Sequence, residues 1–292
     1  MIQTPLMQKP LVTGFFHKET WSIAYLVEDP ATKHAAIIDP VLDYDEKAGR
    51  VATTFADAML EEVVRRGLTV KWILDTHPHA DHFSAAAYLK ERLGVPTGIG
   101  EKVVDVQRLW KEIYNLPDFP ADGSHWDHLF ADGDSFSIGA LPARAIFSPG
   151  HTLASVTYVV GDVAFVHDTI FQPDFGTARA DFPGGSPESL YRSIQTILAL
   201  PDDTRLFTGH DYMPGGREPR WESSVGEQKR ENVHLRDNPS EEAFVARRRR
   251  RDAELPMPRL ILHALQVNMR GGRLPEPEDN GRIYLKIPIG AL

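Results

Sequence analysis

Residues 70–82 read VKWILDTHPHADH, and this stretch decides both the fold and the chemistry expected of the chain. Its first five residues are mostly apolar and predict a short strand. The strand runs directly into a loop that carries three histidines and two aspartates. Imidazole and carboxylate groups suit zinc, iron or manganese ions. Because a tight loop can turn alternate side chains toward one point, the stretch predicts a metal site built from His77, His79, Asp81 and His82.

The same loop also admits a plainer interpretation. A helix is expected directly after it, at residues 83–93, and Asp81 stands where the N-cap of that helix belongs. Capping and metal binding are compatible roles for one aspartate. Chance would produce such a pattern in roughly one or two of a thousand chains of this composition. The metal interpretation is therefore favoured.

Three further candidate ligands each follow a predicted strand. His151 stands in SPGHT (148–152), Asp168 in VHDT (166–169) and His210 in TGHD (208–211). Any one of them alone would more often be an ordinary surface or core residue. Catalytic sites are commonly built from side chains that a rigid scaffold delivers at the ends of several strands. Their shared position therefore adds these three residues to the expected site.

Short strands alternate with helices through two halves of the chain. Apolar runs predict strands at residues 21–27, 35–38, 70–74, 135–138, 142–148, 155–160, 163–167 and 205–208. Helical spacing predicts helices at 51–66, 83–93, 101–114 and 186–199, and residues 117–134 are expected to form a loop. This order indicates an α/β fold with two packed sheets and helices outside, a four-layer αββα sandwich. One domain is expected over residues 1–292, with a helical extension from about residue 222 onward.

Composition narrows the classes of protein to consider. The chain has 292 residues, no cysteine and a formal charge of -9. Without cysteine there are no disulfides, thiolate ligands or cysteine nucleophiles. The negative charge makes nucleic acid and acidic lipid poor partners, so the five arginines at 247–251 are expected to form a solvated helix face. No apolar run approaches the ~20 residues of a membrane helix. The N-terminal residues do not resemble a signal peptide, and a cytoplasmic location is expected.

Four motifs carry a resemblance to a known family. THPHADH (76–82), SPGHT (148–152), HDT (167–169) and GHDY (209–212), in this order and at these intervals, resemble the metallo-β-lactamase superfamily. The resemblance extends over nearly the whole chain and implies the αββα fold. GTARADF (176–182) and NMRGG (268–272) are most similar to the persulfide dioxygenase, or sulfur dioxygenase, group and its bacterial β-lactamase-like relatives.

That resemblance implies a metal and a reaction. His77, His151 and Asp168 would bind one iron(II), and this two-histidine, one-carboxylate triad leaves positions open for substrate and O₂. A thiol persulfide, expected to be glutathione persulfide, would be oxidised with O₂ to sulfite and the free thiol. The superfamily's other ligands are matched too. They would either surround the iron or bind a second metal, as in dinuclear zinc members, and they are His79, Asp81, His82 and His210.

The resemblance also implies substrate-binding residues. Arg179 matches an arginine of the family's pocket, and Tyr212 matches a pocket tyrosine that would also serve the reaction. Thr177 stands where the animal branch has a cysteine, and His234 where it has an arginine. Residues 214–220 look like an insertion after His210. These departures lie near the expected substrate entrance and put the identity of the thiol carrier in doubt.

One function is favoured at this point and two alternatives remain open. The favoured function is the iron persulfide dioxygenase, and the first alternative is a dinuclear zinc hydrolase of the glyoxalase II-like thioesterase type, in which zinc activates water. The retained ligand set leaves iron or zinc, and one ion or two, undecided. The second alternative is a non-catalytic metal or persulfide sensor, which would bind persulfide without consuming oxygen. No nucleic-acid or membrane partner is expected, and a homodimer is possible.

Overall fold

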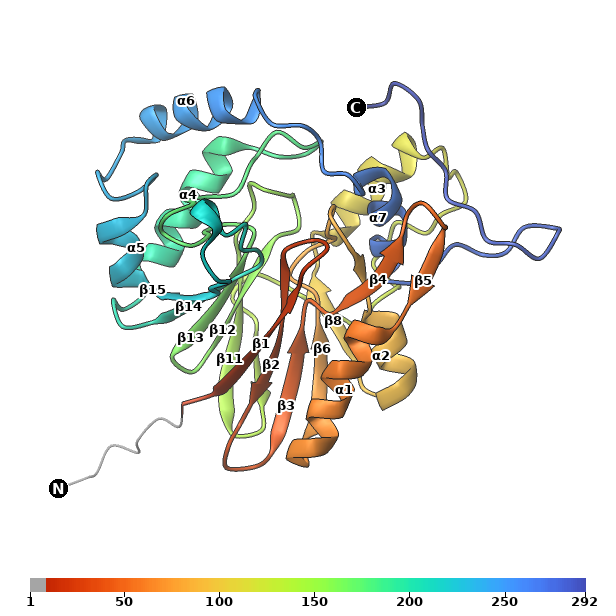
Figure 1. Cartoon of the computed structure of the whole chain (residues 1–292), viewed down its shortest axis with the longest axis horizontal. Coiled ribbons are helices and arrows are strands. Elements are labelled where there is room, and N and C mark those ends of the chain that lie inside the picture. Colours follow the sequence, from red (N-terminus) through yellow and green to blue (C-terminus); the bar gives the residue numbers. More distant parts are fainter. Residues whose placement is uncertain (1–8) are drawn as a thin grey trace.

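The computed structural model describes residues 9–292, and its two large sheets lie face to face between outer helices (Figure 1). The first sheet has the order β1-β2-β3-β6-β8-β9. Its strands are β1 (Leu11–His17), β2 (Ser22–Glu28), β3 (His34–Ile38), β6 (Thr69–Leu74), β8 (Thr97–Gly100) and β9 (His128–Phe130). The second has the order β10-β11-β12-β13-β14-β15. Its strands are β10 (Ser135–Ile138), β11 (Leu141–Phe147), β12 (Val156–Val160), β13 (Val163–His167), β14 (Arg205–Thr208) and β15 (Glu222–Ser224).

Helices cover the outer face of each sheet, which confirms the αββα sandwich. On the first sheet lie α1 (Thr54–Arg66), α2 (Ala86–Leu93), α3 (Val103–Ile113) and α7 (Ile261–Asn268). On the second lie α4 (Pro187–Leu198), α5 (Val225–Glu231) and α6 (Glu241–Asp252). The start of α4 is fixed by its sequence, because Ser186 accepts a hydrogen bond from the Ser189 amide and Pro187 occupies the first turn.

Aromatic side chains fill the space between the sheets. Tyr25, Phe165 and Phe207 are at most 2% exposed and contact one another, with ring centroids 5.2–5.5 Å apart. Each such side chain contributes about 1.5–3 kcal/mol through burial of apolar surface. The Tyr25 hydroxyl donates to the Thr208 carbonyl, and the Tyr158 hydroxyl donates to the Asp75 carbonyl at 3.0 Å. These bonds tie the core to the ends of the strands that carry the candidate ligands.

Two expectations about secondary structure were wrong. Residues Phe83–Ser84 form β7, which joins β4 (Val41–Asp45) and β5 (Arg50–Ala52) in a small third sheet, so the helix expected from residue 83 begins at Ala86. The region 117–134 is not all loop, because β9 pairs in parallel with β8. Both strands are too short to show an alternating pattern. The two-residue hairpin at Gly161-Asp162 is present between β12 and β13.

The C-terminal region begins with a strand that belongs to the second sheet. β15 pairs antiparallel with β14, so the second sheet continues past residue 222. The N-terminal residues were expected not to form a signal peptide. Residues 1–8 of that stretch lie outside the described part of the chain. Within residues 9–292, no helix is long and apolar enough to cross a membrane.

Candidate metal centre

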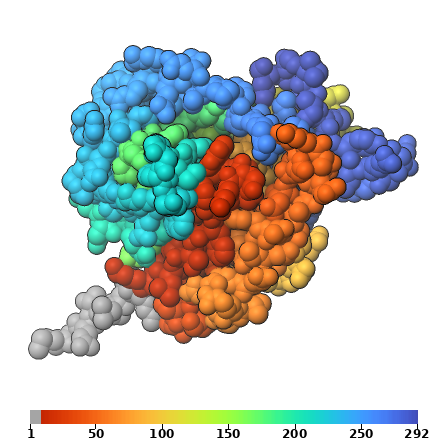
Figure 2. Space-filling model, in the orientation of Figure 1, coloured from red at the N-terminus to blue at the C-terminus, as the bar shows by residue number. Residues whose placement is uncertain are grey.

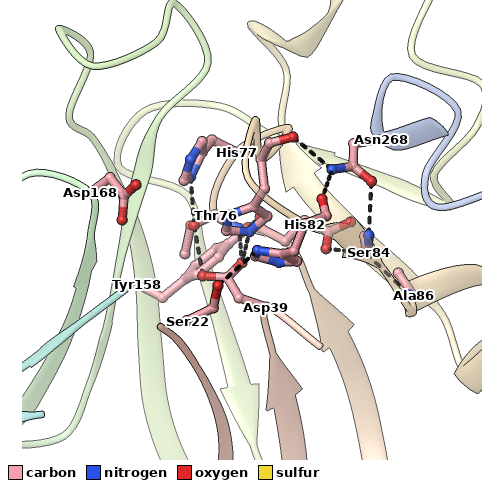
Figure 3. Close-up of polar contacts among 12 residues, drawn as sticks. Ser22, Asp39, Thr76, His77, His82, Ser84, Ala86, Tyr158, Asp168 and Asn268 are labelled. Atoms are coloured by element: carbon pink, nitrogen blue, oxygen red, sulfur yellow. Dashed lines mark hydrogen bonds and ion pairs between the residues drawn. The ribbon is translucent and has the colours of Figure 1, made fainter. Parts of the chain in front are cut away.

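The ends of strands from both sheets meet at one place and bring the candidate ligands together. β3 and β6 are parallel neighbours in the first sheet, and β13 and β14 are parallel neighbours in the second. Loops that follow β6 and β13 carry His77 and Asp168, and the loop after β11 carries His151. One potential ligand atom from each of these three buried residues lies within 4.8 Å of the others. In Figure 3, Asp168 lies to the left of His77 and of the other labelled residues.

Two further ligand groups lie beside the first. Asp81, Asp168 and His210 have ligand atoms within 4.8 Å of one another, and so do His79, Asp81 and His82. Asp168 belongs to both the first and the second group, and Asp81 belongs to the second and the third. All seven residues that the sequence predicted as ligands or their neighbours are therefore in one cluster.

The cluster contains buried polar atoms that have no hydrogen-bond partner among residues 9–292. Leaving a buried donor or acceptor unpaired costs about 1–3 kcal/mol. Several such atoms at one point therefore indicate a cation-binding site rather than a chance defect, and imidazole nitrogen with carboxylate oxygen suits zinc or iron. The atoms include Nε2 of His77, Nδ1 of His79, Nε2 of His82, Oδ1 of Asp168 and Nδ1 of His210. The residues present thus fit a metal centre.

Neighbouring groups fix which nitrogen of each histidine faces the centre. The Thr76 hydroxyl donates to Asp39 at 2.8 Å, so its oxygen is free to accept from Nδ1 of His77 at 3.0 Å. Nδ1 of His151 donates to the Arg179 carbonyl at 2.9 Å. In both rings Nε2 is left for a metal, which is how outer hydrogen bonds orient metal ligands.

Asp39 supports a third histidine from behind. Its Oδ1 accepts from the Thr76 amide at 2.7 Å and lies 3.1 Å from Nε2 of His79. Burial disfavours a charged imidazole, but the Asp39 carboxylate outweighs it and raises the pKa of His79 to about 9. Asp39 follows β3 directly and was not singled out from the sequence, because a lone aspartate after a strand carries no recognisable signal.

Asn268, at the end of α7, holds the ligand loop from the other side. Its Nδ2 donates to the carbonyls of His79 and His82, both at 2.7 Å, and its Oδ1 accepts from the Ser84 amide at 2.8 Å (Figure 3). The NMRGG motif was recognised only as a mark of resemblance. The structure gives its asparagine a role, which is to fix the backbone of the histidine loop.

Ser22 holds the side chains of the same loop. Its hydroxyl donates to Asp81 Oδ2 at 2.9 Å and lies 3.1 Å from His82 Nδ1. A chain of polar contacts continues through Thr20 at 2.7 Å to Nδ1 of His17 at 2.8 Å. His17 was assigned no role from the sequence, and it lies at the outer end of this chain.

Mutual interactions set the charges in the cluster before any metal binds. Burial disfavours ionisation of Asp168, yet the His210 and His151 beside it lower its pKa to about 2. Burial likewise disfavours the charged form of His210, but Asp168, Tyr212 and Asp81 raise its pKa well above the usual value. Burial lowers the pKa of His77 well below its usual value, and the neighbouring histidines lower it further. The His77 ring is thus neutral and ready to bind a metal, while His210 is the cation that balances the two aspartates.

A cavity of about 480 Å³ opens onto the cluster. Asp81, His151, Asp168 and His210 line its inner end. The Tyr212 ring stacks on His210 with centroids 5.5 Å apart, and burial raises the pKa of Tyr212 to about 12. The phenol is therefore neutral at neutral pH and able to donate a hydrogen bond into the cavity.

Arg179 lies in the cavity wall with its guanidinium already engaged. Its Nε and Nη2 each donate to Asp181 at 2.7 Å, and its Nη1 donates to the Pro256 carbonyl at 2.6 Å. The guanidinium also covers the Phe182 ring at 4.7 Å. Its charge is thus largely neutralised by Asp181, and its backbone carbonyl holds His151.

Thr177, His234 and residues 214–220, which depart from the animal persulfide dioxygenases, do not all lie at the cavity. Thr177 lines the cavity, and its amide donates to Nδ1 of His234 at 3.0 Å. His234 lies behind Thr177 and is not among the lining residues. Within 214–220, Arg217 forms ion pairs with Asp174 and Asp211 at 2.5–2.6 Å, away from the cavity lining.

The arginine run was wrongly expected to be a solvated face throughout. Arg248 is 3% exposed and donates to Asp252 at 2.8 Å and to the Thr177 carbonyl at 3.0 Å. Arg248 and Arg251 both line the cavity. Figure 2 shows the light-blue residues of α6 at the surface over the green segment of the chain, and α6 packs against α4. That packing turns one side of the run inward, which the charges alone did not reveal.

Known proteins similar to the chain agree with this geometry. The model of the metallo-beta-lactamase superfamily matches residues 22–210. A beta-lactamase hydrolase-like protein of Xylella fastidiosa is 67% identical over 100% of this chain and 67% of its own length, so the chain spans about two thirds of that relative. Glyoxylase B2 of Dictyostelium discoideum is 45% identical over 98% of this chain and 99% of its own.

Similarity to persulfide dioxygenases is more distant. The mitochondrial persulfide dioxygenase ETHE1 of Bos taurus is 30% identical over 90% of this chain and 89% of its own. The crystal structure of ETHE1 from Myxococcus xanthus superimposes with a TM-score of 0.72 at 30% identity, covering 90% of this chain and 100% of that one. Fold, ligand cluster and relatives together identify a metal-dependent enzyme. The chain belongs to the metallo-beta-lactamase superfamily.

Proposed function

We propose that the chain is a metal-dependent hydrolase that binds two metal ions and cleaves the thioester of a small thiol carrier. The observation that carries the proposal is the full set of ligand atoms, buried in every residue but the partly buried Asp81 and arranged in groups that share Asp168 and Asp81. A site for one ion needs three of these residues, and the remaining ones would otherwise keep unpaired polar atoms at a cost. The names of the relatives from Xylella and Dictyostelium also favour hydrolysis.

Each part of the site has a distinct task in this reaction. One ion would be held by His77, His151 and Asp168, and the second by Asp81, His210 and Asp168, with His79 and His82 adding donors to the pair. When bound, zinc supplies a lowered pKa for water and polarises a carbonyl.

The chain's own groups orient the substrate and handle protons. Tyr212 is neutral and donates a hydrogen bond to an oxygen of the substrate. The aromatic side chains of Phe171, Phe175 and Tyr212, which line the cavity, exclude water from the reacting carbonyl. Without metal, His210 holds a proton beside Asp81 at 3.5 Å and Asp168 at 3.3 Å.

Thiol release from S-lactoylglutathione tests the proposal. Protein loaded with zinc should bind two ions per chain and release glutathione, and His151→Ala should lose both the first ion and the activity. Zinc-loaded protein with two bound ions and no thioesterase activity on this or a simpler S-acyl thiol would overturn hydrolysis as the function.

A second candidate is the iron persulfide dioxygenase. The specific observation that favours it is the group His77, His151 and Asp168, which is by itself a two-histidine, one-carboxylate site of the kind that non-haem iron oxygenases use. Similarity to persulfide dioxygenase extends over 90% of this chain. Oxygen uptake matched by sulfite, from protein loaded anaerobically with iron and given glutathione persulfide, would establish this reaction. Binding of persulfide without oxygen uptake or thioester cleavage would indicate a sensor.

A further inference from the structure

Four arginines line the cavity, and three of them are neutralised. Arg179 pairs with Asp181 at 2.7 Å, Arg248 with Asp252 at 2.6 Å and Arg259 with Glu46 at 3.2 Å. The fourth is Arg251. Among residues 9–292, no carboxylate lies within 4.0 Å of its guanidinium.

Arg251 is also unlike its neighbours in the arginine run. Arg247 donates to the His234 carbonyl at 3.1 Å, and Arg249 pairs with Glu188 at 2.6 Å. Arg251 instead lies over the ring of Phe175, 5.5 Å from its centroid, and is half-buried. A stacked guanidinium keeps its edge free for hydrogen bonds, so Arg251 presents an unneutralised cation to the cavity.

A continuous aromatic wall joins this cation to the metal centre. The ring of Phe175 lies 4.8 Å from that of Tyr212, and Tyr212 stacks on the ligand His210 at 5.5 Å. Phe175, Tyr212, His210 and Arg251 all line the same cavity. An extended peptide residue spans about 3.5 Å. Three successive contacts of 4.8–5.5 Å thus separate Arg251 from the metal centre, and a carrier the size of a short peptide is of matching scale.

We propose that Arg251 is an anion-binding subsite, which holds a carboxylate of the thiol carrier while the sulfur end of the carrier lies at the metal centre. A guanidinium binds a carboxylate through two parallel hydrogen bonds. The partly buried position strengthens this interaction relative to open solvent. The proposal rests on the proposed function in one respect, which is that the substrate is built on a thiol carrier, and it holds for thioester and persulfide alike.

The net charge of the chain makes the position of this cation informative. At a formal charge of -9 the protein repels anions in general. The inner end of the cavity adds Asp81 and Asp168, which a bound metal compensates. The guanidinium of Arg251 is therefore the place in the cavity where an anionic group of the carrier would bind. It favours an acidic carrier over a neutral one.

The test compares Arg251→Gln with Arg250→Gln in zinc-loaded protein. Arg250 is the adjacent residue of the same run, is exposed, and does not line the cavity, so its substitution removes the same charge without touching the subsite. Calorimetry measures binding of two probes, S-methylglutathione and its diethyl ester, which lacks the carboxylates. Metal content and circular dichroism confirm that each variant is folded and loaded.

Arg251→Gln should weaken binding of S-methylglutathione by about 10-fold or more, as expected for loss of a charged hydrogen-bonded pair. The ester should bind the parent protein and the variant equally, and Arg250→Gln should match the parent protein. With a substrate that the enzyme turns over, Arg251→Gln should have a higher KM than the parent protein and an unchanged kcat.

Equal binding of S-methylglutathione to Arg251→Gln and parent protein would overturn the subsite. Absence of binding of either probe to the parent protein would overturn the subsite and the glutathione-type carrier together. Binding that depends on Arg251 but leads to no thioester cleavage would uphold the subsite and overturn only the proposed hydrolysis.

Discussion

Asn268 lies 2.7 Å from the carbonyl oxygen of His79, so a residue near the end of the chain holds the loop that defines the metal site. The bond joins α7 to a motif that precedes it by 189 positions. The same amide group also binds the His82 carbonyl. The histidine loop is thus fixed by a distant helix as well as by its own sequence.

Replacing Asn268 with leucine should therefore damage both stability and metal binding. The substitution keeps a similar volume but leaves two carbonyls and the Ser84 amide buried and unpaired, at a cost of about 2–4 kcal/mol in the free energy of unfolding. We expect a lower Tm and weaker zinc binding, measured by thermal denaturation and metal titration. Asn280→Ala, in an exposed turn, is the control. An unchanged Tm for Asn268→Leu would show that the loop does not depend on α7.

Removing the Ser22 hydroxyl should act on the second ion and spare the first. Ser22→Ala removes the hydrogen bond to Asp81 and the contact with His82, whereas His77 and His151 keep their partners. Loss of an outer partner of a metal ligand weakens metal affinity by about 10- to 100-fold. Metal analysis after dialysis should show close to one ion per chain in place of two. Loss of both ions in equal measure would contradict this separation, and Ser124→Ala at the surface serves as the control.

Binding of the second ion should release a proton from His210. Burial opposes the charged ring, but Asp168 and Asp81 raise the pKa of His210 well above its usual value, so the ring is protonated at neutral pH in the metal-free protein. A metal ligand must be deprotonated. Affinity for the second ion should therefore rise with pH across the neutral range.

Calorimetry in buffers of different ionisation enthalpy measures this release directly. Protein with His210 intact should release about one more proton per chain than His210→Gln when it takes up metal at pH 7. Equal release by both proteins would show that His210 is neutral before the metal binds.

Substitution of Arg179 should affect the cavity more than the metal. The side chain braces Asp181 and the Pro256 carbonyl, while the bond to His151 comes from its backbone. Arg179→Gln should therefore keep both ions and raise KM several-fold, because the wall carrying Pro256 loses its anchor. Steady-state kinetics and metal content check this. Lost metal would mean that the side chain positions His151 indirectly, and unchanged KM would place this wall outside substrate binding.

The sequence predicted which residues gather at the candidate metal centre because their signal is local. His77, His79, Asp81 and His82 stand within six residues, and His151, Asp168 and His210 each follow a strand with a clear apolar pattern. Residues that support the ligands had no such signal. Asp39 and Ser22 meet the site only because strands distant in sequence are neighbours in the fold.

The arginine run at 247–251 shows where prediction from the sequence failed. Its charges predicted solvent exposure, and packing of α6 on α4 decided otherwise for Arg248 and Arg251. Which side of a charged helix faces inward depends on the partner helix, and a single sequence does not specify that partner. The short strands β7 and β9 were not predicted for a related reason. Each is defined by its pairing with another strand, which its own sequence does not indicate.

The superfamily match ends at residue 210, and this boundary has a practical meaning. The seven clustered ligand residues lie within the matched segment, whereas Arg248, Arg251 and Asn268 lie beyond it. If Arg251 is the subsite proposed above, part of the selectivity for the carrier lies outside the segment that supplies the clustered residues. A designer could vary Arg251 to redirect the enzyme toward another carrier while Arg248 and Asp252 continue to hold the cavity wall and Asn268 the histidine loop.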